Sequence, residues 1–274
     1  MCSMTASETY ETLALRRDGP CLHLTLNRPA ARNTLTHAMM EEIGAVVAAV
    51  ADDSDIRVLV LRGAGGHFSA GGDINFMQHL PPSPPAGEVD PLVAPYRYFG
   101  DVLMQLNALD QAVVAVVDGN AVGGGLGMVC CSDVVIARSQ AIFSIPEPRH
   151  GFIPSQIIPF VTRRIGEARA RYMAVTGARV DGAQAVDWGI AQFCCEDDAA
   201  VEAALDQALR QILACSPPAV ATVKRLVLAV DRQSDAAVLD DAAESLIRLL
   251  RSPDGREGMA AFLEKRRPGW LREP

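Results

Sequence analysis

The sequence lacks the short motifs that mark several common protein classes. Its glycine clusters contain no GxGxxG, no GxxxxGK followed by Ser or Thr occurs, and Ser69 lacks the preceding glycine of a GxSxG turn. These motifs serve dinucleotide binding, phosphate binding and serine hydrolysis, so all three classes are disfavoured. The seven cysteines include no CxxC pair, the usual spacing in zinc and thioredoxin-like sites.

Long apolar segments and a leader-like start are also missing. No apolar run reaches the roughly 18 to 20 residues that a membrane-spanning helix needs. Residues 1–10 lack the basic start and the apolar stretch of a signal peptide. We therefore expect a cytoplasmic protein without a membrane partner.

Positive charge is in short supply. The chain has 25 Lys and Arg against 33 Asp and Glu, a formal net charge of −8. Nucleic-acid-binding proteins usually carry a basic face, so no nucleic-acid partner is expected. A phosphate-bearing ligand would need local basic residues, and one such cluster lies near the C-terminus: Lys265, Arg266, Arg267 and Arg272.

The composition is that of a globular protein with a sizeable core. Hydrophobic residues make up 49% and charged residues 21% of the 274 positions, which excludes a disordered or fibrous chain. The cysteines are odd in number and mostly have apolar neighbours, so we expect reduced cysteines in the core.

The first half of the chain predicts an α/β core. Residues 12–16 and 22–26 alternate apolar and polar positions around a turn, which indicates a β-hairpin. Thr36 is a plausible N-cap for a helix to about Val50. The β-branched segments at 57–61 and 112–117 predict buried strands, and a short apolar helix through Cys131 and a strand at 134–137 follow.

The second half predicts a loop and then helices. Residues 77–100 are rich in proline and show no clear period until near their end, so most of this segment should be a loop. It is either a lid over a binding site or a surface excursion. From Pro154 onward the patterns predict helices at 156–165, 167–175, 182–187, 199–214, 218–230, 235–250 and 253–265.

Two glycine-rich segments follow predicted strands. HFSAGGD (67–73) comes after the strand at 57–61, and GNAVGGG (119–125) comes after the strand at 112–117 and opens a helix. Glycine lets a ligand approach backbone N–H groups closely, and a helix N-terminus carries partial positive charge. Two such N–H groups converging on one point would form an oxyanion hole, whereas each segment alone could be a tight turn.

The glycine segments belong to a longer series of motifs. FSAGGDI (68–74) and GNAVGGG (119–125) are preceded by NRPAARNTL (27–35) and followed by FSIPEPRHGFIPS (143–155). Together they resemble the enoyl-CoA hydratase/isomerase, or crotonase, family. The resemblance continues through residues 167–190, 216–226 and 257–270. Residues 154–166 look most like the branch acting on methylglutaconyl- and isohexenylglutaconyl-CoA.

This resemblance implies a fold and partners. It implies an α/β spiral of ββα units over residues 1–200, holding the acyl-CoA site, and a helical C-terminal trimerisation region over residues 201–274. The partner would be an acyl-CoA thioester substrate, with no separate cofactor because coenzyme A is part of the substrate, and no metal. A homotrimer, or a hexamer of two trimers, is expected.

It also implies roles for particular residues. The N–H groups of Gly72 and Gly124 would hold the thioester oxygen. Ala70 would lie against the adenine of CoA, and Arg28 and Lys265 would lie near its phosphates. Glu147 matches the second of two glutamates that the family's hydratases use.

The place of the first glutamate is taken by Gly127. A single carboxylate cannot hold and deprotonate a water as a pair does. Three functions therefore stay open: a hydratase-like lyase for an unsaturated, glutaconyl-type acyl-CoA, an enoyl-CoA isomerase using one glutamate, and an acyl-CoA-binding protein without catalysis. Arg149 and His150 could contact a second substrate carboxylate, or they could be ordinary structural residues.

Overall fold

The fold is described from a computed structural model, and the structure describes residues 10–271. Arg272 and the first of the seven cysteines, Cys2, lie outside these residues. The predicted hairpin is confirmed: β1 (Leu13–Asp18) pairs antiparallel with β2 (Cys21–Leu26), and Asp18 faces Cys21 across the turn.

The hairpin forms one edge of a six-stranded sheet with the order β1-β2-β3-β4-β6-β9. All further pairs in this sheet are parallel. The additional strands are β3 (Val58–Gly63), β4 (Ala112–Val117), β6 (Val134–Arg138) and β9 (Phe193–Cys195). Because β3 and β4 are parallel neighbours, the two glycine-rich segments leave the sheet at the same end of these strands.

A second, three-stranded sheet lies beyond the ends of β3 and β4 from which the glycine-rich segments leave. It has the order β5-β7-β8, and consists of β5 (Ala121–Val122), β7 (Phe143–Ser144) and β8 (Arg179–Val180). Short 3-10 turns at η1 (Pro29–Ala31), η2 (Ala64–Gly66) and η3 (Glu147–His150) connect the strands and helices around it.

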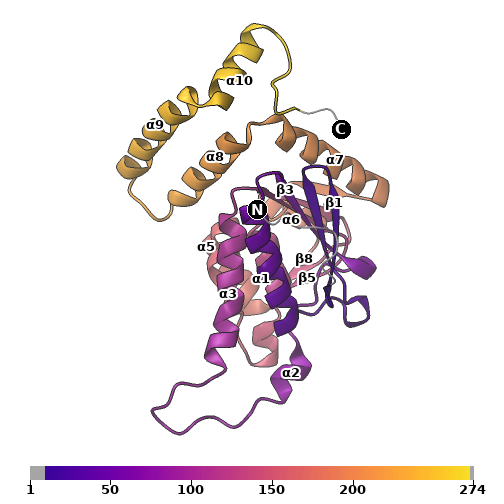
Figure 1. Cartoon of the computed structure of the whole chain (residues 1–274). Coiled ribbons are helices and arrows are strands. Elements are labelled where there is room, and N and C mark those ends of the chain that lie inside the picture. Colours follow the sequence, from indigo (N-terminus) through magenta and orange to yellow (C-terminus); the bar gives the residue numbers. More distant parts are fainter. Residues whose placement is uncertain (1–9, 272–274) are drawn as a thin grey trace.

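Both faces of the large sheet are covered, which explains the uninterrupted apolar strands. Leu59 and Leu61 of β3 belong to the main core, whereas Val58 and Val60 face the other way. On the main-core side α1 (His37–Asp52) packs beside α3 (Val93–Ala108) (Figure 1). On the other side α7 (Asp198–Ala214) packs against β4, β6 and β9.

The N-terminal cap of α1 is confirmed, and a helix in the predicted loop was missed. The Thr36 hydroxyl accepts a hydrogen bond from the Met39 N–H at 3.2 Å, and α1 ends two residues beyond the predicted Val50. The predicted loop over 77–100 is too long, because α2 (Ile74–Gln78) enters it and α3 begins at Val93. Only residues 79–92 between these helices carry no helix or strand.

The predicted C-terminal helices are present. The segment α5 (Ile158–Thr176) is broken at Gly166, where φ is 77° and ψ is 158°, which matches the predicted division between 165 and 167. After α6 (Gly182–Trp188), the helices α8 (Pro217–Ala229), α9 (Asp235–Arg251) and α10 (Pro253–Leu263) extend beyond the sheet, at the end opposite to α2 (Figure 1). The domain boundary at residue 200 stays a prediction, and α7 itself lies on the sheet.

The structure bears on the expected core cysteines and on the expected lack of a membrane-spanning helix. Four free cysteines are buried, but Cys194 and Cys215 are exposed, so the expectation of core cysteines is wrong for these two. Among the described residues, no single helix is both long and apolar enough to cross a membrane; α7 and α8 meet that measure only as a pair bent by 102°.

Asn33 ties together the loops that lead to the first glycine segment. Its side chain is fully buried, and its φ of 54° is a left-handed conformation that asparagine tolerates. The amide donates to the carbonyl oxygens of Ala64 at 2.9 Å and His67 at 2.8 Å, and its Oδ1 accepts from the Arg28 N–H at 2.9 Å. One side chain therefore fixes three backbone groups.

We predict that Asn33→Ala lowers the free energy of unfolding by about 2 to 4 kcal/mol, because it leaves those buried backbone groups without partners. Urea unfolding of the variant and the wild type measures this. Asn107→Ala is the control, since the Asn107 side chain makes no hydrogen bond to the described residues, and its stability should change by less than about 0.5 kcal/mol. Equal losses in the two variants would contradict the prediction.

Candidate active site

The two glycine segments lie side by side and are joined by backbone hydrogen bonds. The Ser69 N–H donates to the Asn120 carbonyl at 2.9 Å, and the Val122 N–H donates to the Ser69 carbonyl at 3.0 Å. This contact has no room for a side chain at Gly125, where a Cβ atom would lie 2.8 Å from the Ser69 Cβ. The close approach therefore explains why glycine occupies this position.

Each segment presents one backbone donor without an acceptor. Gly124 is the first residue of α4 (Gly124–Cys130), where helix geometry leaves the N–H unpaired. Gly72 bridges to Leu35, but that contact uses the Gly71 carbonyl as acceptor from the Leu35 N–H at 2.8 Å. Within the described residues, neither the Gly72 nor the Gly124 N–H donates a hydrogen bond, so both are available to a ligand oxygen.

Glu147 lies directly beside the second glycine segment. Gly123 has a φ of 51°, and a Cβ atom on it would overlap the Glu147 Oε1 atom. The carboxyl group is therefore one residue away from the free Gly124 N–H. Pro146 and Pro148 flank Glu147 in η3, and their fixed φ angles limit the freedom of the backbone that carries it.

The Glu147 carboxyl group is partly buried. Its Oε2 atom has no hydrogen-bond partner among the described residues. Burial raises the pKa of Glu147, and the residue's own backbone N–H and the charge of His150 lower that pKa by less. A carboxyl with a raised pKa accepts and returns a proton more readily near neutral pH, which suits a general acid and base.

Apolar side chains surround the free N–H groups. A side chain at Gly124 would begin 2.7 Å from the Leu35 Cδ1 atom and 3.0 Å from the Phe99 ring, and one at Gly72 would begin 2.8 Å from the Met77 methyl. Hydrogen bonds are stronger in apolar surroundings. Phe99 belongs to the helix α3 that the sequence patterns did not reveal.

The position of the first family glutamate is filled by hydrocarbon. A side chain at Gly127 would overlap Ile157, which is 2% exposed, and would begin 3.4 Å from the Leu103 Cδ1 atom. No second carboxylate takes its place there. Ile157 lies within the segment 154–166, which was noted for its resemblance, but no local pattern shows which residue it contacts.

Two predicted CoA-binding residues lie near the first glycine segment. The Ala70 N–H donates to the Arg32 carbonyl at 3.0 Å, which places Ala70 against the loop that begins at Arg28. The Arg28 Nη1 atom donates to the Thr34 carbonyl at 3.2 Å. The two residues therefore lie on adjoining loops.

Within one chain, Lys265 lies away from the first glycine segment. It is exposed and follows α10, which lies at the opposite end of the molecule from α2 (Figure 1). Beside it, Arg266 is already paired with Glu257 and Glu264, both at 2.6 Å. A contact between Lys265 and a ligand at Gly72 would therefore require a neighbouring chain.

Arg149 has a structural partner. Its Nε and Nη2 atoms donate to the Thr176 carbonyl at 3.1 and 3.0 Å, where they hold the end of α5. His150 is exposed and stacks on Phe152. These contacts favour structural roles for both residues over contact with a substrate.

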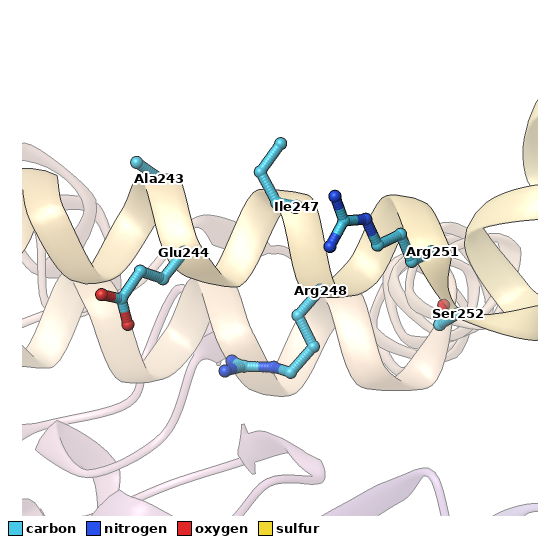
Figure 2. A pocket seen from close by; sticks show the side chains of 6 residues that line it. All are labelled: Ala243, Glu244, Ile247, Arg248, Arg251 and Ser252. Atoms are coloured by element: carbon cyan, nitrogen blue, oxygen red, sulfur yellow. The ribbon is translucent and has the colours of Figure 1, made fainter.

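A separate groove of about 830 Å³ runs along α9. Figure 2 shows the six side chains that line it: Ala243, Glu244, Ile247, Arg248, Arg251 and Ser252. The helix α9 extends beyond the sheet, at the end of the molecule opposite to α2 (Figure 1). We do not assign the active site to this groove, because its one carboxyl group, that of Glu244, is exposed to solvent. In the part of the chain that the structure describes, no group of three or more His, Cys, Asp or Glu side chains is placed to hold a metal ion.

Comparison with known proteins identifies the family. A sequence model described as enoyl-CoA hydratase/isomerase matches residues 17–273. The carnitinyl-CoA dehydratase of Citrobacter koseri is 31% identical over 95% of this chain and 98% of its own length. The enoyl-CoA hydratase EchA19 of Mycobacterium tuberculosis is 30% identical over 97% and 99%. The chain therefore belongs to the enoyl-CoA hydratase/isomerase, or crotonase, family of enzymes.

Solved structures agree with this assignment. An enoyl-CoA hydratase/isomerase from Marinobacter aquaeolei is 41% identical, with a TM-score of 0.90 over 96% of this chain and 100% of that one. Pseudomonas aeruginosa AtuE is 44% identical, with a TM-score of 0.90 and the same coverage. The predicted crotonase fold is thus confirmed.

We predict that Gly124→Pro lowers turnover by about 10²-fold or more, because proline removes one donor to the thioester oxygen. Proline is well tolerated at the first position of a helix, so the fold should persist. Gly124→Ala is the matched control: it adds the same Cβ atom beside Leu35 and Phe99 but keeps the N–H. Steady-state kinetics compares the two, and equal losses would show that crowding, rather than the missing donor, lowers the rate.

Proposed function

We propose that this enzyme is a hydratase-like lyase that adds water to an unsaturated acyl-CoA of the branched, glutaconyl type. The observation that carries the proposal is the Glu147 carboxyl group one residue from the free Gly124 N–H, with its buried Oε2 atom unpaired among the described residues. A proton-transfer group beside an anion-stabilising donor is what the formation of a thioester enolate requires.

The reaction follows from these positions. The N–H groups of Gly72 and Gly124 bind the thioester oxygen and stabilise the negative charge that develops on it. Glu147 takes a proton from water as the water oxygen bonds to the β-carbon, and the electron pair of the double bond moves into the enolate. Glu147 then returns a proton to the α-carbon, so that one water is added and the enzyme is regenerated.

The names of the relatives support water chemistry on CoA thioesters, since one is called a dehydratase and another a hydratase. The glutaconyl type of acyl group is supported by the resemblance of residues 154–166 alone. The trimer or hexamer and the cytoplasmic location also stay predictions.

The hydrocarbon beside Gly127 favours an alternative, enoyl-CoA isomerase activity. With Ile157 at this position, Glu147 is the carboxyl group that lies against the segment of the free Gly124 N–H, and hydrocarbon fills the place of the first family glutamate. An isomerase needs no more than that, because one carboxylate can remove a proton from one carbon and return it to another.

Mass spectrometry of the products in heavy water decides between the two reactions. We expect a 2-enoyl-CoA to gain the mass of one water, with methylglutaconyl-type thioesters as the best substrates. Deuterium uptake with a shifted double bond and no added water would instead establish the isomerase. Unchanged substrates across a broad acyl panel would refute both and leave an acyl-CoA-binding protein.

Glu147→Gln keeps the shape of the side chain but removes its base, and should lower turnover by about 10² or more. It should also stabilise the fold at pH 7. Because burial raises the pKa of Glu147, the wild type loses stability as the pH rises through that pKa, whereas the uncharged variant does not.

Urea unfolding at several pH values checks this second expectation. The advantage of the variant should shrink as the pH falls through the raised pKa towards that of an ordinary glutamate. A variant that is inactive but less stable than the wild type at pH 7 would mean that Glu147 has a structural role.

A further inference from the structure

Two polar side chains meet over a buried glycine of α3. The Gln156 Oε1 atom occupies the space in which a side chain of Gly100 would begin, and the Arg97 Nη1 atom lies 2.8 Å from that position. We call Arg97, Gly100 and Gln156 the Gly100 corner. Because Gly100 has no side chain, the amide and the guanidinium can share this place.

Residues next to the Gly100 corner contact the helix that begins at Gly124 at two points. Phe99, the neighbour of Gly100, lies 3.0 Å from the position of a Gly124 side chain. Ile157, the neighbour of Gln156, fills the position of a Gly127 side chain. The polar corner therefore lies next to the apolar wall beside the free N–H groups, where the acyl part of a bound thioester would extend.

Both polar groups keep capacity for a ligand. The half-buried Gln156 amide makes no hydrogen bond to the described residues. Arg97 pairs with Asp101 at 2.6 Å through Nη1, and the two side chains are 48% and 43% exposed. Such exposed pairs within one helix are weak, so an anionic ligand can replace Asp101 without a large penalty.

We propose that the Gly100 corner binds a carboxylate at the far end of the acyl chain, and so selects dicarboxylic acyl groups. A guanidinium matches a carboxylate with two parallel hydrogen bonds, and the Gln156 amide supplies a further donor. A plain alkyl chain offers these groups no acceptor. The inference rests on the proposed function, because it specifies the acyl group of the same site.

Binding of two saturated thioesters tests the inference without turnover. Glutaryl-CoA and pentanoyl-CoA have the same chain length and differ in the terminal carboxylate, and calorimetry gives their dissociation constants. We expect the wild type to prefer glutaryl-CoA, and Arg97→Gln to weaken glutaryl-CoA binding by about 10- to 100-fold with little effect on pentanoyl-CoA. Gln156→Met should act in the same direction, with a smaller effect.

Two further variants separate recognition from general damage. Asp101→Asn frees Arg97 and should strengthen glutaryl-CoA binding. Arg171→Gln removes an arginine of the same kind, which pairs with Glu167 one turn away in α5, and should change neither affinity. Thermal unfolding verifies that each variant is folded.

Equal affinities of the wild type for the two thioesters would overturn the inference, as would an equal loss of both in Arg97→Gln. These outcomes are distinct from failure of the proposed function. An enzyme that hydrates neutral enoyl-CoAs but shows no carboxylate preference would refute the Gly100 corner and the glutaconyl type of acyl group, and would leave the hydratase standing. An enzyme that prefers glutaryl-CoA but adds no water would refute only the hydratase.

Discussion

The backbone pairing between Ser69 and the segment around Ala121 is the contact on which the active site depends. It joins the ends of two neighbouring parallel strands, and so determines the distance between the Gly72 and Gly124 donors. The pairing uses main-chain atoms alone and leaves no space for a Cβ atom at Gly125. Rigid strands, rather than side-chain conformers, therefore position the two N–H groups, and the proposed oxyanion hole requires donors that are preorganised in this way.

Glu147 completes the site at an electrostatic cost. Its carboxyl group is held against Gly123 without a partner for Oε2, and the burial that raises its pKa also disfavours the charged form in the folded state. The surrounding structure must supply this energy. The buried side chains of β3 in the main core and the Asn33 hydrogen bonds, which fix the adjoining loops, are among the contacts that supply it.

Sequence patterns sufficed where local interactions decide the structure. The cap at Thr36 and the break at Gly166 are set by nearby backbone geometry, and both were predicted. The helix α3 was not, because it follows a proline-rich segment and its apolar face is defined by contact with α1. Glu147 and the glycine pairs were recognised from motifs, but the contact of Ile157 with Gly127 joins distant parts of the chain and has no local pattern.

The contact between Gly127 and Ile157 has an evolutionary consequence. A glutamate at 127 alone would overlap Ile157, and a smaller residue at 157 alone would leave a cavity in the packing between α4 and α5. Each single step towards a site with two carboxylates is therefore unfavourable, although the two together could be accommodated. Residues 127 and 157 would therefore have to change together before the chain could gain a carboxylate at position 127.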